Sequence, residues 1–71
     1  MKSRYFIDNG NEWNKTLCLR IDNGCESVFA FIKPNMSWVT LTHYYKNDLC
    51  KSLKSNEVKE INDKEAALIV G

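Results

Sequence analysis

The side chains best able to do chemistry in this chain of 71 residues are three cysteines and a single histidine. They are Cys18, Cys25, His43 and Cys50, which match in number the thiolate and imidazole ligands of a structural zinc site. Their spacing is unfavourable for zinc, because no Cys-x-x-Cys or His-x-x-x-His pair would hold two ligands on one turn. We therefore expect reduced thiols, no metal ion and no other cofactor.

The same side chains are poor candidates for covalent catalysis. Cys18 or Cys50 could pair with His43 as nucleophile and base, but the surrounding Thr-Leu-Thr-His-Tyr-Tyr run holds no carboxylate that would orient the imidazole. The three glycines fall in two Asn-Gly sequences and at position 71, so there is no glycine-rich phosphate loop. The sequence predicts that the protein is not an enzyme.

Composition limits the remaining classes of protein. A hydrophobic content of 44% is typical of a folded chain, and 71 residues predict one small domain, residues 1–71. Ten basic and nine acidic residues leave a formal charge of +1, well below that of a dedicated duplex-DNA binder. Only three apolar residues separate Arg4 from the first turn, too few for a signal peptide or a spanning helix. We expect a cytoplasmic protein that does not contact a membrane.

One tetrapeptide, Ile-Asp-Asn-Gly, occurs at residues 7–10 and again at residues 21–24. Asn-Gly accepts the positive φ angles of a two-residue type I′ turn, so each copy predicts the tip of a β-hairpin. The resulting register pairs Phe6 with Trp13, Leu17 with Ala30, and Leu19 with Val28. The predicted core face then consists of Phe6, Trp13, Leu17, Leu19, Val28, Ala30 and Ile32. A longer first loop that includes Asn11 would shift the first pairing by one residue.

The middle of the chain predicts a further strand and a short helical turn. Pro34 ends the third strand, because proline cannot donate to a strand ladder. The β-branched and aromatic residues from Trp38 to Tyr45 favour a fourth strand over a helix. Asn47 or Asp48 can cap the helical turn that follows. The apolar side of this turn would hold Leu49 and Leu53.

The C-terminal residues predict an extended segment and then a helix. Residues 57–61 have an extended pattern, and Asn62 and Glu65 have the spacing of a capping box. The helix would run from about Asp63 to Val70 and pack Ala66, Leu68 and Ile69 on the sheet. The predicted fold class is therefore α+β, with an antiparallel meander of three to four strands and one or two short C-terminal helices.

The segments Phe29-Ala30-Phe31-Ile32 and Leu41-Thr42-His43-Tyr44 are similar in order and spacing to the two motifs of cold-shock domains. This resemblance implies a small OB-like β-barrel as the alternative fold. It also implies that single-stranded RNA or DNA stacks on Phe29, Phe31, His43 and Tyr44. In the competing interpretation, Phe29 and Phe31 pack under the C-terminal helix.

The chain also resembles small phage and mobile-element proteins. The resemblance rests on Arg4-Tyr5-Phe6 with the following Asp8-Asn9-Gly10, on Trp38, and on the segment from Val58 to Ala66. It implies a small antiparallel sheet with a terminal helix. It further implies a protein that binds and inhibits a host protein, such as a restriction, CRISPR or toxin component.

The aromatic content favours a binding surface. Tyr5, Trp38, Tyr44 and Tyr45 are more large rings than so small a core can bury, and exposed Tyr and Trp are enriched at interface hot spots. We expect Trp38, Tyr44, Tyr45 and Lys46 to form a protein contact patch. A homodimer through an open strand edge is the alternative that would hide some of these rings, and a structural homo-oligomeric subunit is a further functional class.

Overall fold

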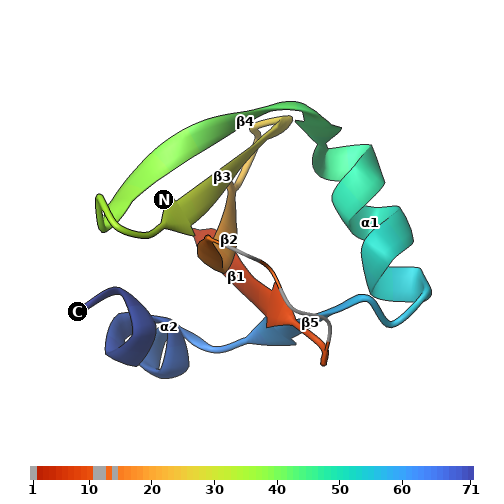
Figure 1. The fold of residues 1–71 in the computed structure, drawn as a ribbon. Helices are drawn as coiled ribbons and strands as arrows, with labels where there is room; N and C mark the ends of the chain where they lie inside the picture. The colour runs from red at the N-terminus through yellow and green to blue at the C-terminus, as the bar shows by residue number, and fades with distance from the viewer. Residues whose placement is uncertain (1, 11–12, 14) are drawn as a thin grey trace.

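The computed structural model describes residues 2–10, 13 and 15–71, and within them it contains a five-stranded antiparallel sheet and two helices (Figure 1). The strands are β1 (Ser3–Asp8), β2 (Thr16–Asp22), β3 (Ser27–Ile32), β4 (Ser37–Tyr45) and β5 (Val58–Ile61). The helices are α1 (Lys46–Lys54) and α2 (Asp63–Val70). The α+β meander is confirmed, but it has five strands rather than three to four because the extended segment after α1 joins the sheet.

The strand order is β4-β3-β2-β1-β5. The first four strands follow one another as a meander, and β5 returns after α1 to pair with β1, with Tyr5 opposite Ile61 and Asp8 opposite Val58. Within the described residues β4 and β5 are therefore the two edges of an open sheet. These pairings differ from the small OB-like barrel that was the alternative prediction.

The two Asn-Gly sequences follow strands as predicted, but the prediction that they form type I′ turns is wrong. Gly10 and Gly24 have φ angles of +95° and +81°, whereas Asn9 and Asn23 are not among the described residues with positive φ. A type I′ turn needs positive φ at both central residues. In the second turn, the Cys25 amide donates to the Asp22 carbonyl at 3.0 Å.

The predicted register is wrong in both hairpins. Phe6 lies opposite Leu19 rather than Trp13, because β1 ends at Asp8 and β2 begins only at Thr16. Asn11, which the longer-loop alternative includes, lies outside the described residues. In the second hairpin Leu19 lies opposite Ala30 rather than Val28. That shift of two residues preserves the faces of the strands, because side chains alternate with a period of two.

The sheet buries apolar side chains on both faces. The first core cluster is Phe6, Leu19, Ile21, Val28, Ala30, Leu49 and Val58, with Trp13, Ile32, Val39, Leu41, Tyr44 and Leu53 packed against it. Helix α1 covers this face through Leu49 and Leu53, on the side of the helix that the sequence predicts. Apart from Leu17, the predicted core face is found here. Leu17 belongs to the other face because the β2–β3 register shifts between Thr16 and Cys18.

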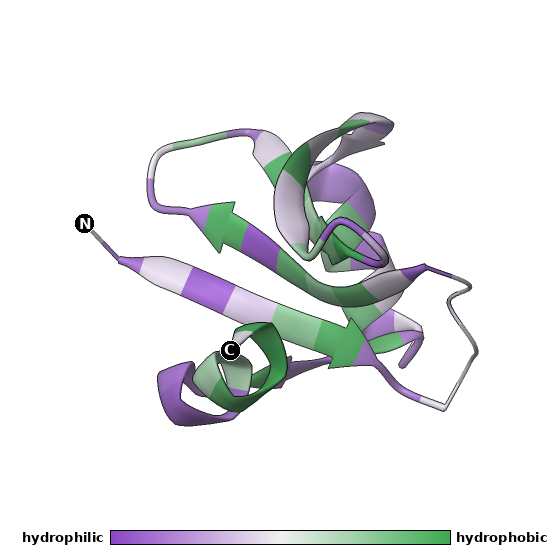
Figure 2. Ribbon diagram, turned by 60° about the vertical axis from the view of Figure 1, so that its left-hand side comes forward, coloured by the Kyte–Doolittle hydropathy of each residue, from purple (hydrophilic) through white to green (hydrophobic). Residues whose placement is uncertain are grey.

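The second core cluster lies under α2, on the opposite side of the central strands (Figure 1). It consists of Cys18, Phe31, Ile61 and Ala66, with Tyr5, Ile7, Leu17, Trp38, Ile69 and Val70 packed against it. Figure 2 shows the hydrophilic start and hydrophobic end of α2. Leu68 is predicted to lie in the core but is 86% exposed. Because Leu68 is two residues after Ala66 on the helix, its side chain points away from the face on which Ala66 packs.

Both helix starts are capped by local side chains. The Glu65 amide donates to Asn62 Oδ1 at 2.8 Å and the Asn62 amide donates to Glu65 Oε1 at 3.3 Å, so the predicted capping box is confirmed. At α1 the N-cap residue is Tyr45 rather than Asn47 or Asp48. Asp48 still contributes, since its Oδ2 accepts a hydrogen bond from the Tyr45 amide at 2.9 Å.

A bulge bends β4 between Thr40 and Tyr45. Ser27 pairs with Tyr45 and Phe29 with Thr40, so Val28 on β3 faces the longer stretch 41–44 on β4. Within that stretch His43 has a φ of +63°, in the left-handed region. An extra stretch of chain bends a strand and increases its twist. Figure 1 shows β4 curving over the sheet toward α1.

The left-handed backbone at His43 predicts a specific mutational pattern. His43→Val should lower the free energy of unfolding by about 1–2 kcal/mol, because this backbone region is unfavourable for residues with a Cβ and worst for β-branched ones. His43→Gly should change it by roughly 0.5 kcal/mol or less, since relief of strain offsets glycine's larger unfolded-state entropy. Urea unfolding measures both. Thr42→Val is the control, and equal stability of His43→Val and wild type would contradict the bulge.

Candidate functional site

The four residues predicted to contact a protein lie along one edge of the sheet. Trp38 is near the start of β4, Tyr44 and Tyr45 are its last two residues, and Lys46 is the first residue of α1. We call residues 37–46 the β4 surface. Its position is set by the topology, because β4 pairs only with β3 in the described part of the chain.

The side chains of the β4 surface lie on both faces of the sheet. Trp38 packs in the second core cluster, where its ring centroid is 5.2 Å from that of Phe31 in an edge-on arrangement. Tyr44 packs against the first core cluster, and its hydroxyl donates to Ser52 Oγ at 2.9 Å. Tyr45 is 48% exposed. The four residues therefore flank an edge strand rather than form one flat aromatic patch.

The guanidinium group of Arg20 lies against the ring of Trp38. Its guanidinium carbon lies 4.6 Å from the centroid of the Trp38 ring and 4.6 Å from that of Phe29. Asp22 fixes the guanidinium, with Arg20 Nε 3.1 Å from Asp22 Oδ1 and Nη2 donating to Oδ2 at 3.4 Å. Ser3 Oγ donates to Asp22 Oδ1 at 2.7 Å. This stacked and hydrogen-bonded arrangement restricts the Trp38 ring.

Sequence reasoning missed Arg20 as a site residue. Alternation along the strands places Arg20 on the same face as Phe29, and that signal is present in the sequence. The third partner, Trp38, comes from a strand whose register depends on the loop at 33–36. The stacking of Arg20 between two rings was therefore not predictable without the β3–β4 pairing.

The residues implied by the cold-shock resemblance do not lie on one open face. Phe31 is only 5% exposed and belongs to the same cluster as Ala66 of α2, as the competing interpretation expected. Phe29 is half-buried under Arg20, and Tyr44 lies against the other face of the sheet. Of this set only His43 is exposed. Stacking on bases requires accessible ring faces, which Phe31 does not offer.

The thiols and the imidazole lie in different environments. Cys18 is buried, Cys25 half-buried and Cys50 exposed, and each of these described cysteines is free. Burial raises the pKa of the Cys18 thiol. Among the described residues no three histidine, cysteine or acidic side chains are close enough to share a metal ion.

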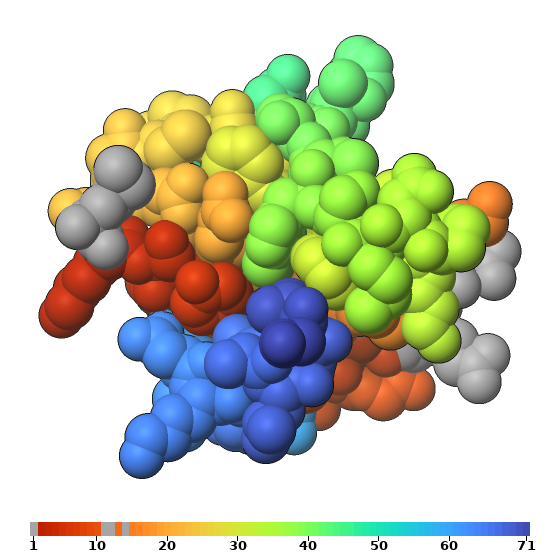
Figure 3. All heavy atoms as spheres, turned by 90° about the vertical axis from the view of Figure 1, so that its left-hand side faces the viewer, coloured from red at the N-terminus to blue at the C-terminus, as the bar shows by residue number. Residues whose placement is uncertain are grey.

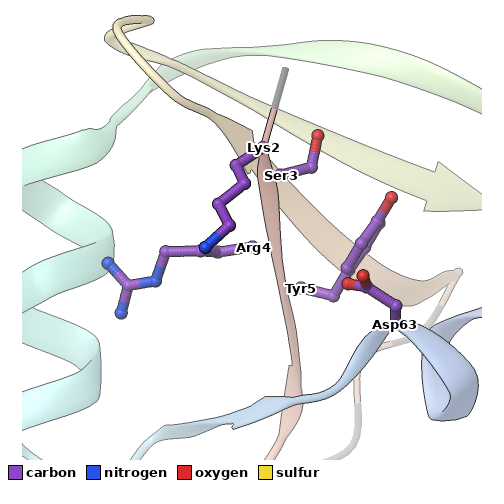
Figure 4. A pocket seen from close by; sticks show the side chains of 5 residues that line it. All are labelled: Lys2, Ser3, Arg4, Tyr5 and Asp63. Atoms are coloured by element: carbon purple, nitrogen blue, oxygen red, sulfur yellow. The ribbon is translucent and has the colours of Figure 1, made fainter.

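Two neighbouring hollows lie in the described surface beside β1 and β5. One shallow hollow is lined by Lys2, Ser3, Arg4, Tyr5 and Asp63 (Figure 4), and a second adjoins it beside β5. Arg4 Nη2 lies 2.8 Å from Glu60 Oε1, and this hydrogen-bonded pair lowers the pKa of Glu60 and raises that of Arg4. Because both partners are about half exposed, the pair stabilises the fold by only a few tenths of a kcal/mol.

Neither described helix is long and apolar enough to cross a membrane. Comparison with protein-family models, with curated proteins and with solved structures gives no match for this chain.

The Arg20 stack predicts a change in the accessibility of Trp38. In a Trp13→Phe background Trp38 is the single tryptophan, and Arg20→Ala should increase acrylamide quenching of its fluorescence by about twofold, because one ring face loses its cover. Arg4→Ala is the matched control, since Arg4 stacks on Phe6 instead. Unchanged quenching in Arg20→Ala would show that the arginine does not cover the ring.

Thiol reactivity follows from the three environments. Cys50 should react first with a disulfide reagent, Cys25 more slowly, and Cys18 only on unfolding, because it is inaccessible and its raised pKa disfavours the thiolate. Cys50→Ser should remove the fast phase. Reaction of Cys18 at the rate of Cys50 in the folded protein would contradict the placement of β2.

Proposed function

We propose that this chain is a non-enzymatic domain that binds another protein through the β4 surface. The observation that supports it most is the character of β4. This edge strand is nine residues long and contains no charged residue, with Trp38 near one end and Tyr45 at the other. Long uncharged edges invite pairing with other chains, and natural proteins normally protect them.

The other edge of the sheet provides the contrast. β5 has only four residues, and Lys59 and Glu60 occupy its centre with both side chains exposed. Charged side chains, short length and bulges all protect an edge strand. β4 is long and uncharged, and its bulge is confined to residues 41–44, so residues 37–40 lack these protections. This supports a role for this edge that β5 does not share.

Side chains around β4 suit recognition by a protein. Met36, just before the strand, and Tyr45 at its end are 50% and 48% exposed. Trp38 is held by Arg20 and Phe31, so little side-chain entropy is lost when a partner contacts its exposed part. Aromatic residues anchor many interfaces, and a preorganised ring contributes more than a mobile one.

The biological role we propose is inhibition of a host protein, such as a defence component, by a phage or mobile-element protein. It rests on the sequence resemblance to such proteins. A small domain of this kind acts by occupying a surface that its target needs.

A crosslinking experiment tests the proposal. A photoreactive phenylalanine analogue in place of Tyr45 should crosslink to a protein in host-cell lysate, and the same analogue in place of exposed Leu68 should not. Tyr45→Ala together with Trp38→Phe should reduce capture of that protein by roughly tenfold, the effect of losing about 1.4 kcal/mol. Both substitutions are mild for the fold, and circular dichroism checks it.

Two results would contradict the proposal. The first is equal crosslinking at positions 45 and 68, which would show that capture does not use the β4 surface. The second is saturable, salt-sensitive binding of a labelled single strand that is lost in Phe29→Ala, which would favour nucleic acid instead. A stable homo-oligomer without either property would identify a structural subunit.

A further inference from the structure

We propose that residues 37–40, the straight part of β4, take up an extended segment of the partner as a sixth strand, and that this segment carries acidic side chains. The inference rests on the proposed function and specifies its mode and its partner chemistry. It depends on the free backbone of the edge and on the distribution of charge around it.

The backbone of β4 offers the hydrogen bonds. Residues 37–40 pair with residues 29–32 of β3, and alternate residues of an antiparallel edge direct their N–H and C=O groups away from that neighbour. Strand addition uses such groups for affinity and the alternating side chains for specificity. The bulge at residues 41–44 ends the straight part, so the partner strand covers about four residues, roughly 13 Å.

Charge around the edge selects the partner. No aspartate or glutamate occurs between Ser27 and Asn47, while Lys33 and Lys46 flank the strand on its two sides. The nearest acidic residues along the chain are Glu26 and Asp48, and Asp48 is bonded to the Tyr45 amide. Asp22 also approaches Trp38, but its carboxylate is paired with Arg20. An acidic strand complements this field.

A second copy of the chain complements it less well. Two β4 strands paired antiparallel would supply no acidic side chain to either edge and would bring their lysine-flanked ends together. Figure 3 shows the beginning of β4 at the surface, with the C-terminal end of α2 beside it, in agreement with the packing of Trp38, Ile69 and Val70 against the same core cluster. The occupant we infer is therefore a segment of another protein.

Two synthetic peptides test the inference. Each alternates valine and threonine and has blocked ends, and one is flanked by glutamates while the other is flanked by lysines. By residue-resolved amide exchange, the glutamate peptide should slow exchange in residues 37–40 by about tenfold at saturation. It should bind at least roughly fivefold more tightly than the lysine peptide at low salt, with a smaller difference at high salt. Amides of β5 are the internal control.

Charge variants at an exposed position of the edge give an independent readout. Thr40 is exposed, so Thr40→Glu and Thr40→Lys should both fold. Thr40→Glu should weaken binding of the glutamate peptide about fivefold, and Thr40→Lys should strengthen it about twofold, since only the sign of the charge differs. Equal weakening by both variants would overturn the acidic preference.

Other outcomes also test whether a partner strand adds to β4. Protection of β5 instead of β4, or no protection by either peptide, would overturn strand addition. Concentration-dependent protection of β4 without peptide would identify a second copy as the occupant and overturn the inference. If position 45 still crosslinks to a host protein while the peptides leave β4 unprotected, the proposed function stands and only the strand-addition mode fails.

Discussion

The sheet of this protein is apolar on both faces, and two helices of nine and eight residues cover them. α1 packs Leu49 on one face, and α2 packs Ala66 on the other. Connecting these helices requires the chain to cross from β4 to the far side of β1, where β5 pairs. β5 pairs with the edge of β1 that β2 does not occupy, so β4 remains an edge strand of the sheet. The surface available to a partner thus follows from how the two faces are covered.

Position within this arrangement explains the character of the aromatic residues. Phe31 and Trp38 face α2, and the β1–β2 pair supplies the Ser3–Asp22–Arg20 hydrogen bonds that hold Trp38 from outside. Tyr44 faces α1 and bonds to Ser52. Tyr45 follows at the end of the strand and remains exposed. Rings that the sequence presents as one run are divided between two cores and the solvent, and only a part of them is available for recognition.

Local patterns predicted the elements well and their pairing poorly. The Asn62–Glu65 capping box, the extent of α2 and the fourth strand were all evident from short-range chemistry, because caps and β-branched runs act within a few residues. The register depends on loop geometry. Because the connection between β1 and β2 is long, Phe6 pairs with Leu19 and not with Trp13 as predicted. Pairing of β5 with β1 joins residues more than fifty apart, as in the Arg4–Glu60 contact, and no local signal encodes it. For the same reason Arg20 was overlooked, although alternation along the strands places it on the same face as Phe29.

We propose that β4 is the surface through which the protein binds its partner. Amide exchange of the protein in complex with the partner it captures tests this most directly, by comparison with the free protein. We expect slower amide exchange across residues 37–46 in the complex and no change in β5 or on the outer side of α2. Protection confined to β5 or α2, with β4 exchanging as in the free protein, would contradict it.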